Sequence, residues 1–223
     1  MPRSIPRRTL LLWPFLPYIA MSVVHVGALA MDAAIAAPTK LWLMPLLALP
    51  VIVVAFLRLR PAIAIVLLLA AIVLSCLGDG AGAFFPFGPE LPLMLLFFAL
   101  AHVAYIALFA RVLPVRRMPW WTLVFAAWWI GMLLVLAPHV GALLPAVAAY
   151  GLVLGGTAAF AARCHWLVTA GGVFFLISDT VLAFRLFIDG MPSWTSPLVM
   201  LTYTLGQGLI VAGSLISLPK RTP

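Results

Sequence analysis

The sequence predicts an all-α fold, a polytopic bundle of about eight transmembrane helices with both chain termini in the cytoplasm. Three observations lead to this prediction. The chain of 223 residues is 66% hydrophobic and only 8% charged, which is far more apolar than a soluble domain. Its apolar residues form runs that are long enough to cross a bilayer, and its basic residues alternate from loop to loop. We expect a single integral-membrane domain over residues 1–223, because no polar segment is long enough to form a second one.

Eight apolar runs each have about the 17–25 residues that a spanning helix needs. They cover residues 11–30, 41–57, 62–78, 91–110, 119–137, 140–160, 166–188 and 198–218. Glycine and proline mark most of the joins, and the weakest join lies at Pro138-His139, so seven or nine spans are the alternatives. The first run follows three arginines and contains Ala28-Leu29-Ala30, which makes a cleaved signal peptide the alternative to a first span. Its length and its internal prolines favour a span.

The basic residues orient the bundle. Eleven of the thirteen fall at the two chain ends and in every second loop: Arg3, Arg7, Arg8, Arg58, Arg60, Arg111, Arg116, Arg117, Arg163, Lys220 and Arg221. Lys40 alone lies on the opposite side, and Arg185 lies within the seventh run, where we expect its side chain to extend outward. Cytoplasmic loops carry the excess of lysine and arginine, so the net charge of +8 is a topology signal rather than a nucleic-acid-binding surface. The expected location is the cell membrane, and the excess of arginine over lysine suggests a bacterial inner membrane.

Cysteine and histidine give no sign of a cross-link or a metal site. The predicted topology places Cys76 and Cys164 near opposite faces of the membrane, too far apart for a disulfide. The four histidines are scattered, without the spacing of metal ligands.

Asp179 is the most unusual residue, because it places an ionisable group well inside the seventh run. A carboxylate at membrane depth costs about 3 kcal/mol on insertion scales, so its default interpretation is a functional site that faces the protein interior. The predicted topology places it about nine residues, or roughly 14 Å, from the outer end of its span. Asp79 ends the third span on the same side. The alternatives are a structural hydrogen-bond hub for Asp179 and a helix cap for Asp79.

Further polar residues fall in the same outer half. Tyr203 and Gln207 are four residues apart in the eighth span and share a helix face. His102 and Tyr105 lie in the fourth span, and Lys40 opens the second. Each such group needs a partner in hydrocarbon, so we expect them to face one another around a polar cavity. The alternatives are a packing role for His102 and plain interhelical hydrogen bonds for Tyr203 and Gln207.

Four short motifs around these residues resemble the YhhN family. They are Leu74-Ser75-Cys76-Leu77-Gly78-Asp79, Phe98-Ala99-Leu100-Ala101-His102-Val103-Ala104-Tyr105, Phe174-Phe175-Leu176-Ile177-Ser178-Asp179 and Met200-Leu201-Thr202-Tyr203-Thr204-Leu205-Gly206-Gln207. Pro38-Thr39-Lys40 is similar to the family's start of its second span, and the resemblance runs from about Lys40 to Gly213. The chain departs from the family at Gly80-Ala81-Gly82-Ala83, where members often have an aliphatic turn, and at Thr204, where they often have a second tyrosine. Both departures bear on substrate preference more than on chemistry.

The resemblance implies the activity of the characterised members, which are lysoplasmalogenases. These enzymes hydrolyse the vinyl ether bond of lysoplasmalogens to a fatty aldehyde and glycerophosphocholine or glycerophosphoethanolamine. A vinyl ether is hydrolysed by protonation of the carbon beta to oxygen and addition of water, which requires one protonated group and one ionised group. We therefore expect Asp179, buried in an apolar span, to be the general acid and Asp79 to be the charge stabiliser and base. The reverse assignment is the alternative.

The remaining site residues are assigned to support these two. We expect His102, Tyr203, Gln207 and Ser178 to orient the carboxylates or a water, and Lys40 to meet the substrate phosphate. No metal or organic cofactor is required. The expected partners are a lysophospholipid and the bilayer, with no nucleic acid, and the sequence leaves the oligomeric state open.

Two other classes of function compete with the enzyme. A membrane transporter or lipid-handling protein uses intramembrane polar residues too, but it needs them to reach both faces, whereas here they cluster in the outer half. A sensor or assembly protein without catalysis is the third possibility, although two buried aspartates are a costly way to build one.

Overall fold

A computed structural model describes residues 13–57, 60–113 and 115–218. Six of the basic residues that orient the predicted topology lie outside the described residues: Arg3, Arg7, Arg8, Arg58, Lys220 and Arg221. The first two residues of the first predicted span, 11 and 12, lie outside them as well. The cytoplasmic location of the two termini therefore stays a prediction.

The described residues form an all-helical bundle, which confirms the predicted fold class. The eight long helices are α2 (Leu16–Ala30), α3 (Ala36–Phe56), α4 (Ala62–Asp79), α6 (Glu90–Arg111), α7 (Leu123–Val140), α8 (Leu144–Ala161), α9 (Trp166–Phe187) and α10 (Thr195–Ser217). The short helices are η1 (Trp13–Phe15), α5 (Ala81–Phe84), η2 (Trp120–Thr122) and η3 (Gly141–Leu143).

Prolines shift three helix ends from the positions predicted. Helices α3 and α10 begin earlier than expected, with Pro38 and Pro197 inside their first turns, where a missing N–H removes no intrahelical hydrogen bond. Pro138 does not end α7, which continues to Val140. The chain turns instead at Gly141, whose φ of 58° suits glycine.

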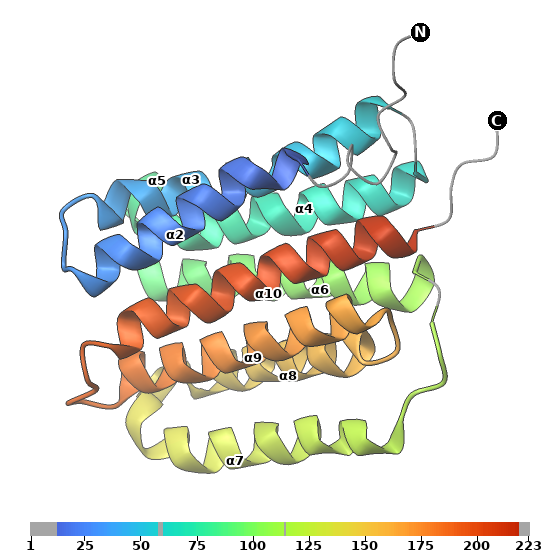
Figure 1. The fold of residues 1–223 in the computed structure, drawn as a ribbon. Coiled ribbons are helices and arrows are strands. Elements are labelled where there is room, and N and C mark those ends of the chain that lie inside the picture. The colour runs from blue at the N-terminus through green and yellow to red at the C-terminus, as the bar shows by residue number, and fades with distance from the viewer. Residues whose placement is uncertain (1–12, 58–59, 114, 219–223) are drawn as a thin grey trace, which may run out of the picture.

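Seven stretches of the described chain are long and apolar enough to cross a membrane. One of them, Trp120–Ala161, spans 42 residues and contains both α7 and α8. Because these two helices lie side by side after the turn at Gly141 (Figure 1), the stretch provides two crossings and the bundle has eight long helices.

Seven of the long helices form a closed ring. Its order is α2, α3, α4, α6, α8, α9 and α10, and α10 packs back against α2. Helix α7 packs outside this ring against α8 and α9 (Figure 1). The start of α2 and the end of α10 lie toward one end of the bundle, which we call the terminal end; Asp79, at the end of α4, lies at the opposite, distal end.

Helices α9 and α10 pack closely against each other, and glycines lie at their contact. A Cβ atom built on Gly171 would lie 2.7 Å from the carbonyl oxygen of Gly206. A Cβ atom built on Gly206 would lie 2.9 Å from the backbone nitrogen of Phe175. Small residues let the backbones of membrane helices approach this closely. The contact fixes Asp179 on α9 relative to Tyr203 on α10.

Candidate active site

The first polar group surrounds Asp79 at the end of α4. Its Oδ1 lies 3.4 Å from Nζ of Lys40 on α3, and its Oδ2 accepts a 2.7 Å hydrogen bond from the Tyr203 hydroxyl on α10. The Asp79 side chain is 5% exposed, whereas that of Lys40 is 34% exposed. A carboxylate at a helix C-terminus meets the negative end of the dipole and cannot cap free carbonyl groups. The helix-cap alternative for Asp79 is therefore not supported, and Lys40 and Tyr203 supply its stabilisation.

Gln207 extends this group along α10 toward the terminal end. Its Nε2 donates to the Ser75 hydroxyl at 3.0 Å and to the Tyr203 hydroxyl at 3.4 Å, which confirms the helix face predicted for Tyr203 and Gln207. Its Oε1 accepts from the hydroxyl of Tyr105 on α6. Tyr105, Ser75 and Gln207 are fully buried. The hydrogen bonds therefore join α4, α6 and α10 around Asp79.

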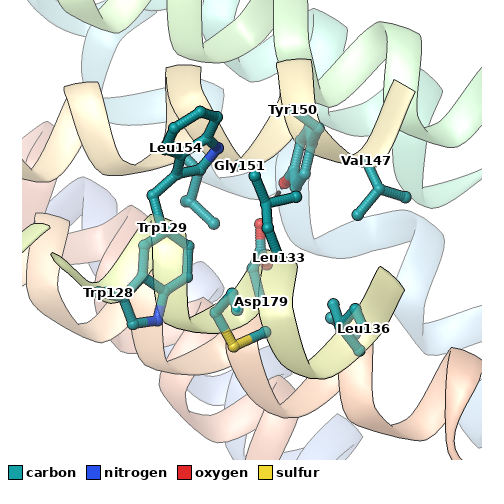
Figure 2. A pocket seen from close by; sticks show the side chains of 11 residues that line it. Trp128, Trp129, Leu133, Leu136, Val147, Tyr150, Gly151, Leu154 and Asp179 are labelled. Carbon is teal, nitrogen blue, oxygen red and sulfur yellow. Dashed lines mark hydrogen bonds between the residues drawn. The ribbon is translucent and has the colours of Figure 1, made fainter. Parts of the chain in front are cut away.

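The second polar group surrounds Asp179 on α9. The hydroxyl of Tyr150 on α8 donates to Oδ2 of Asp179, and the two side chains point toward each other in Figure 2. Nε2 of His102 on α6 lies 3.9 Å from the same oxygen. Nδ1 of His102 lies 3.1 Å from the Thr157 hydroxyl oxygen, and that hydroxyl donates its proton to the Val153 carbonyl at 2.9 Å. The hydroxyl oxygen therefore accepts from Nδ1–H, and Nε2 is the ring nitrogen that faces Asp179.

Asp179 also lines a small hollow between α7, α8 and α9. The hollow has a volume of about 40 Å³, which is room for a few water molecules. Trp128 and Trp129 on α7 form part of its wall (Figure 2). Their indole nitrogens donate to the Thr180 hydroxyl at 3.1 Å and to the Ala148 carbonyl at 2.9 Å. These hydrogen bonds hold the two rings in place beside the carboxylate.

The two polar groups meet at Phe175 rather than in one cavity. The buried Phe175 ring centroid lies 4.6 Å from that of His102 and 5.4 Å from that of Tyr203. The hollow beside Asp179 is not lined by Asp79. The sequence predicts a single polar cavity, but His102 faces Asp179 whereas Tyr105, also on α6, donates to Gln207. The described residues thus form two separate hydrogen-bonded groups with an aromatic contact between them.

Two residues singled out in the sequence have other partners. Ser178, buried on α9, donates to the Val199 carbonyl at 2.9 Å and ties α9 to α10. Arg185 donates to the Thr195 hydroxyl and to the Pro192 carbonyl, so it closes the α9–α10 connection instead of extending outward. Neither side chain contacts an aspartate through a described hydrogen bond or ion pair.

The sequence patterns did not predict Tyr150, Thr157 and Ser75 as members of these groups. A signal was present in the tyrosines, of which the chain has only four. Tyrosine in membrane proteins gathers at the two interfaces, but these four lie within helices. Each donates to an internal partner, as Tyr18 on α2 does to the Thr204 carbonyl at 2.7 Å. A tyrosine deep in a span therefore indicates a buried acceptor.

The described residues offer no grouping of three or more His, Cys, Asp or Glu side chains that would hold a metal ion. Cys76 and Cys164 are both free thiols.

The comparison with known families identifies one match. The model of the YhhN family matches residues 35–214, which run from the loop before α3 to the last turns of α10. No curated protein and no solved structure matches the chain. Both polar groups lie wholly within the matched range, whereas α2 lies outside it.

Proposed function

This chain belongs to the YhhN family, and on that premise we propose that it is a lysoplasmalogenase-like hydrolase of the membrane. The proposed reaction adds water across the vinyl ether bond of a lysoplasmalogen and releases a fatty aldehyde and glycerophosphocholine or glycerophosphoethanolamine. The observation that carries the proposal is the unlike pairing of two buried aspartates, one with a lysine and one with a tyrosine and a histidine.

The chemistry requires two groups in different protonation states. A proton is added to the vinyl carbon beta to oxygen, which leaves an oxocarbenium ion. A water molecule adds to the carbon next to oxygen and loses a proton to a base. The resulting hemiacetal collapses to the aldehyde and the glycerol hydroxyl. The acid ends the cycle without its proton and the base ends it with the proton of the water, so a proton must return from the base to the acid, directly or through solvent, before the next turnover.

The surroundings of Asp179 suit the proton donor. Among the described residues no lysine or arginine pairs with it. Its polar neighbours are the Tyr150 hydroxyl, which donates to Oδ2, and Nε2 of His102, which lies 3.9 Å from the same oxygen. Asp179 is therefore proposed as the general acid, with His102 and Tyr150 as positioning residues.

The surroundings of Asp79 suit the ionised partner. An ammonium group and a phenol hydroxyl both stabilise a carboxylate, and Asp79 has one of each. Asp79 is therefore proposed to stabilise the oxocarbenium charge and to accept the proton of the water. Tyr203 and Gln207 hold it in place. Lys40, about a third exposed at the distal end, is proposed to meet the substrate phosphate.

The test is aldehyde release by the purified protein in detergent or nanodiscs. Asp79→Asn and Asp179→Asn should each lower kcat by about 10²- to 10⁴-fold while the thermal unfolding transition is kept. Asp189→Asn is the matched control, because Asp189 is exposed in the α9–α10 loop and its variant should keep normal turnover. Near-normal turnover by a folded Asp79 or Asp179 variant would remove that carboxylate from the mechanism.

The same protein in liposomes separates the enzyme from a transporter. The proposed hydrolase releases aldehyde without any ion gradient. Gradient-coupled uptake of a lysolipid, with no aldehyde formed, would establish the transporter instead.

A further inference from the structure

A long apolar groove lies on the outer surface of the ring between α2 and α10. Its volume is about 680 Å³, which is in the range of ligand sites. Ile19, Ser22 and Val26 line it from α2, and Leu205 and Ala212 line it from α10. Ile19 and Leu205 are exposed, so the groove is open along its length to the hydrocarbon of the bilayer.

The dimensions of the groove match one hydrocarbon chain in one leaflet. The lining residues extend from Phe15, at the end of η1, to Val26 on α2 and from Leu201 to Ala212 on α10. Each range covers twelve positions, or about 16 Å at the rise of an α-helix. One leaflet of the hydrocarbon core is about 15 Å deep. Because α2 and α10 run along the bundle, the groove runs from the terminal end toward the distal end (Figure 1).

Tyr18 forms part of the groove lining between the two helices. Its hydroxyl donates to the Thr204 carbonyl at 2.7 Å. A Cβ atom on Gly208 would lie 3.1 Å from the Tyr18 ring, so glycine at this position lets the ring pack against α10. The buried hydroxyl is satisfied by the backbone, and the surface that remains for a ligand is nearly all apolar.

The distal end of the groove leads to the Asp79 group through a chain of neighbours. Val26, at that end, follows His25, whose Nδ1 lies 3.0 Å from the Thr39 hydroxyl oxygen on α3. The next residue, Lys40, pairs with Asp79 at 3.4 Å. Neither Lys40 nor Asp79 lines the groove, but these contacts connect its distal end to the Lys40 ammonium group, which complements the phosphate of a lipid headgroup.

We propose that the groove between α2 and α10 binds the hydrocarbon chain of a single-chain phospholipid, with its phosphate at Lys40 and the bond between chain and glycerol beside Asp79. This inference rests on the proposed function and deepens it. It assigns substrate binding to α2, which lies outside the range matched by the family model.

A chain-length experiment tests the groove. Ala212→Trp fills its terminal end, so release of aldehyde from a chain of about 16 carbons should lose at least about tenfold in kcat/KM, while a chain of about 10 carbons loses less than about twofold. Ile216→Trp is the control, because Ile216 is exposed on α10 but does not line the groove. Equal losses for both chain lengths, or the same change in the control, would overturn the proposal.

A binding experiment tests it without hydrolysis. A single-chain ether phospholipid that carries a diazirine near the middle of its saturated chain is photolysed with the intact protein in nanodiscs. Labelling should concentrate on α2 and α10, should fall when unlabelled lysophospholipid is added, and should be weakened by Ala212→Trp. Labelling that excess lysophospholipid does not reduce would show ordinary bilayer lipid and would overturn the proposal.

The two experiments keep the two hypotheses apart. If the wild-type protein releases no aldehyde from any chain length, the proposed function fails, and competition for labelling still decides whether the groove binds a single-chain lipid. If aldehyde is released but labelling lies elsewhere, the function stands and the groove assignment fails.

Discussion

The two aspartates of this bundle occupy the same half of the helices but have opposite kinds of partner. Asp79 has a lysine at 3.4 Å and a tyrosine hydroxyl at 2.7 Å, at a helix end where Lys40 is partly exposed. Asp179 lies in mid-helix against Tyr150 and His102, beside a small hollow. The difference shows that one residue type can receive unlike partners within a single bundle. A lysine ammonium group lies beside one carboxylate, whereas the described ion pairs give the other carboxylate no lysine or arginine partner, so the two side chains have different electrostatic surroundings.

The largest effect on stability and activity is expected at the glycine contact between α9 and α10, because the positions of both polar groups depend on it. Gly206→Ala places a Cβ atom 2.9 Å from the Phe175 backbone nitrogen, so α9 and α10 must separate, and we expect a loss of about 3 kcal/mol in stability and of activity. Gly208→Ala is the matched control, because its Cβ meets only the Tyr18 ring at 3.1 Å. Thermal unfolding in detergent compares the two; equal midpoints would show that the glycine contact does not hold the groups together.

Removal of the cation should affect the Asp79 group alone. Lys40→Met leaves the Asp79 carboxylate buried without its ion pair, and we expect a loss of about 2 kcal/mol, reduced from that of a fully buried pair by the partial exposure of Lys40. Lys40→Arg should keep most of the stability. In the double variant Lys40→Met with Asp79→Asn the loss should be smaller than in Lys40→Met alone, because no unpaired charge remains. Additive losses measured by unfolding would contradict this ion pair.

Removal of one hydroxyl from each group sharpens the comparison. Tyr203→Phe removes the donor to Asp79 and the acceptor of Gln207, both in a fully buried setting, with an expected cost of about 2 kcal/mol. Tyr150→Phe should cost about 1 kcal/mol less, because water in the adjacent hollow can replace its hydroxyl at Asp179. The measurement is the free energy of unfolding of each variant. A larger loss for Tyr150→Phe than for Tyr203→Phe would contradict this prediction.

The smallest effect is expected at Thr157, which is linked to Asp179 only through the His102 ring. Thr157→Val removes the hydroxyl that fixes the His102 ring, at a cost of about 1 kcal/mol. If His102 positions Asp179, kcat should fall while KM is kept, and Thr157→Ser should restore turnover. A change in stability without a change in kcat would leave His102 as a packing residue.

Much of the fold followed from local sequence features. The length of each apolar run predicted the eight helices, because a bilayer of fixed thickness requires about 20 residues to cross it. The spacing of Tyr203 and Gln207 predicted their shared face, because helix geometry brings residues four apart into contact. Helix ends near prolines were less well predicted, since Pro38 and Pro197 are tolerated in first turns.

The membership of the two groups could not be predicted in the same way. Tyr150 and Thr157 join Asp179 only because α8 lies between α6 and α9 in the ring, and no local pattern specifies that neighbour order. The groove has the same origin, because it exists only where α2 closes the ring against α10.

By itself, the sequence determined that this chain forms a membrane bundle, that it resembles the YhhN family, and that Asp79 and Asp179 are its most unusual residues, because composition, span length and a charge in an apolar run are local properties. The tertiary structure alone decided which partner each aspartate receives. It placed Lys40 and Tyr203 at the first and Tyr150 and His102 at the second, because partner choice depends on which helices pack together. Contacts between residues more than a hundred positions apart, such as Tyr203 with Asp79, are set by that packing and by no pattern within a single helix.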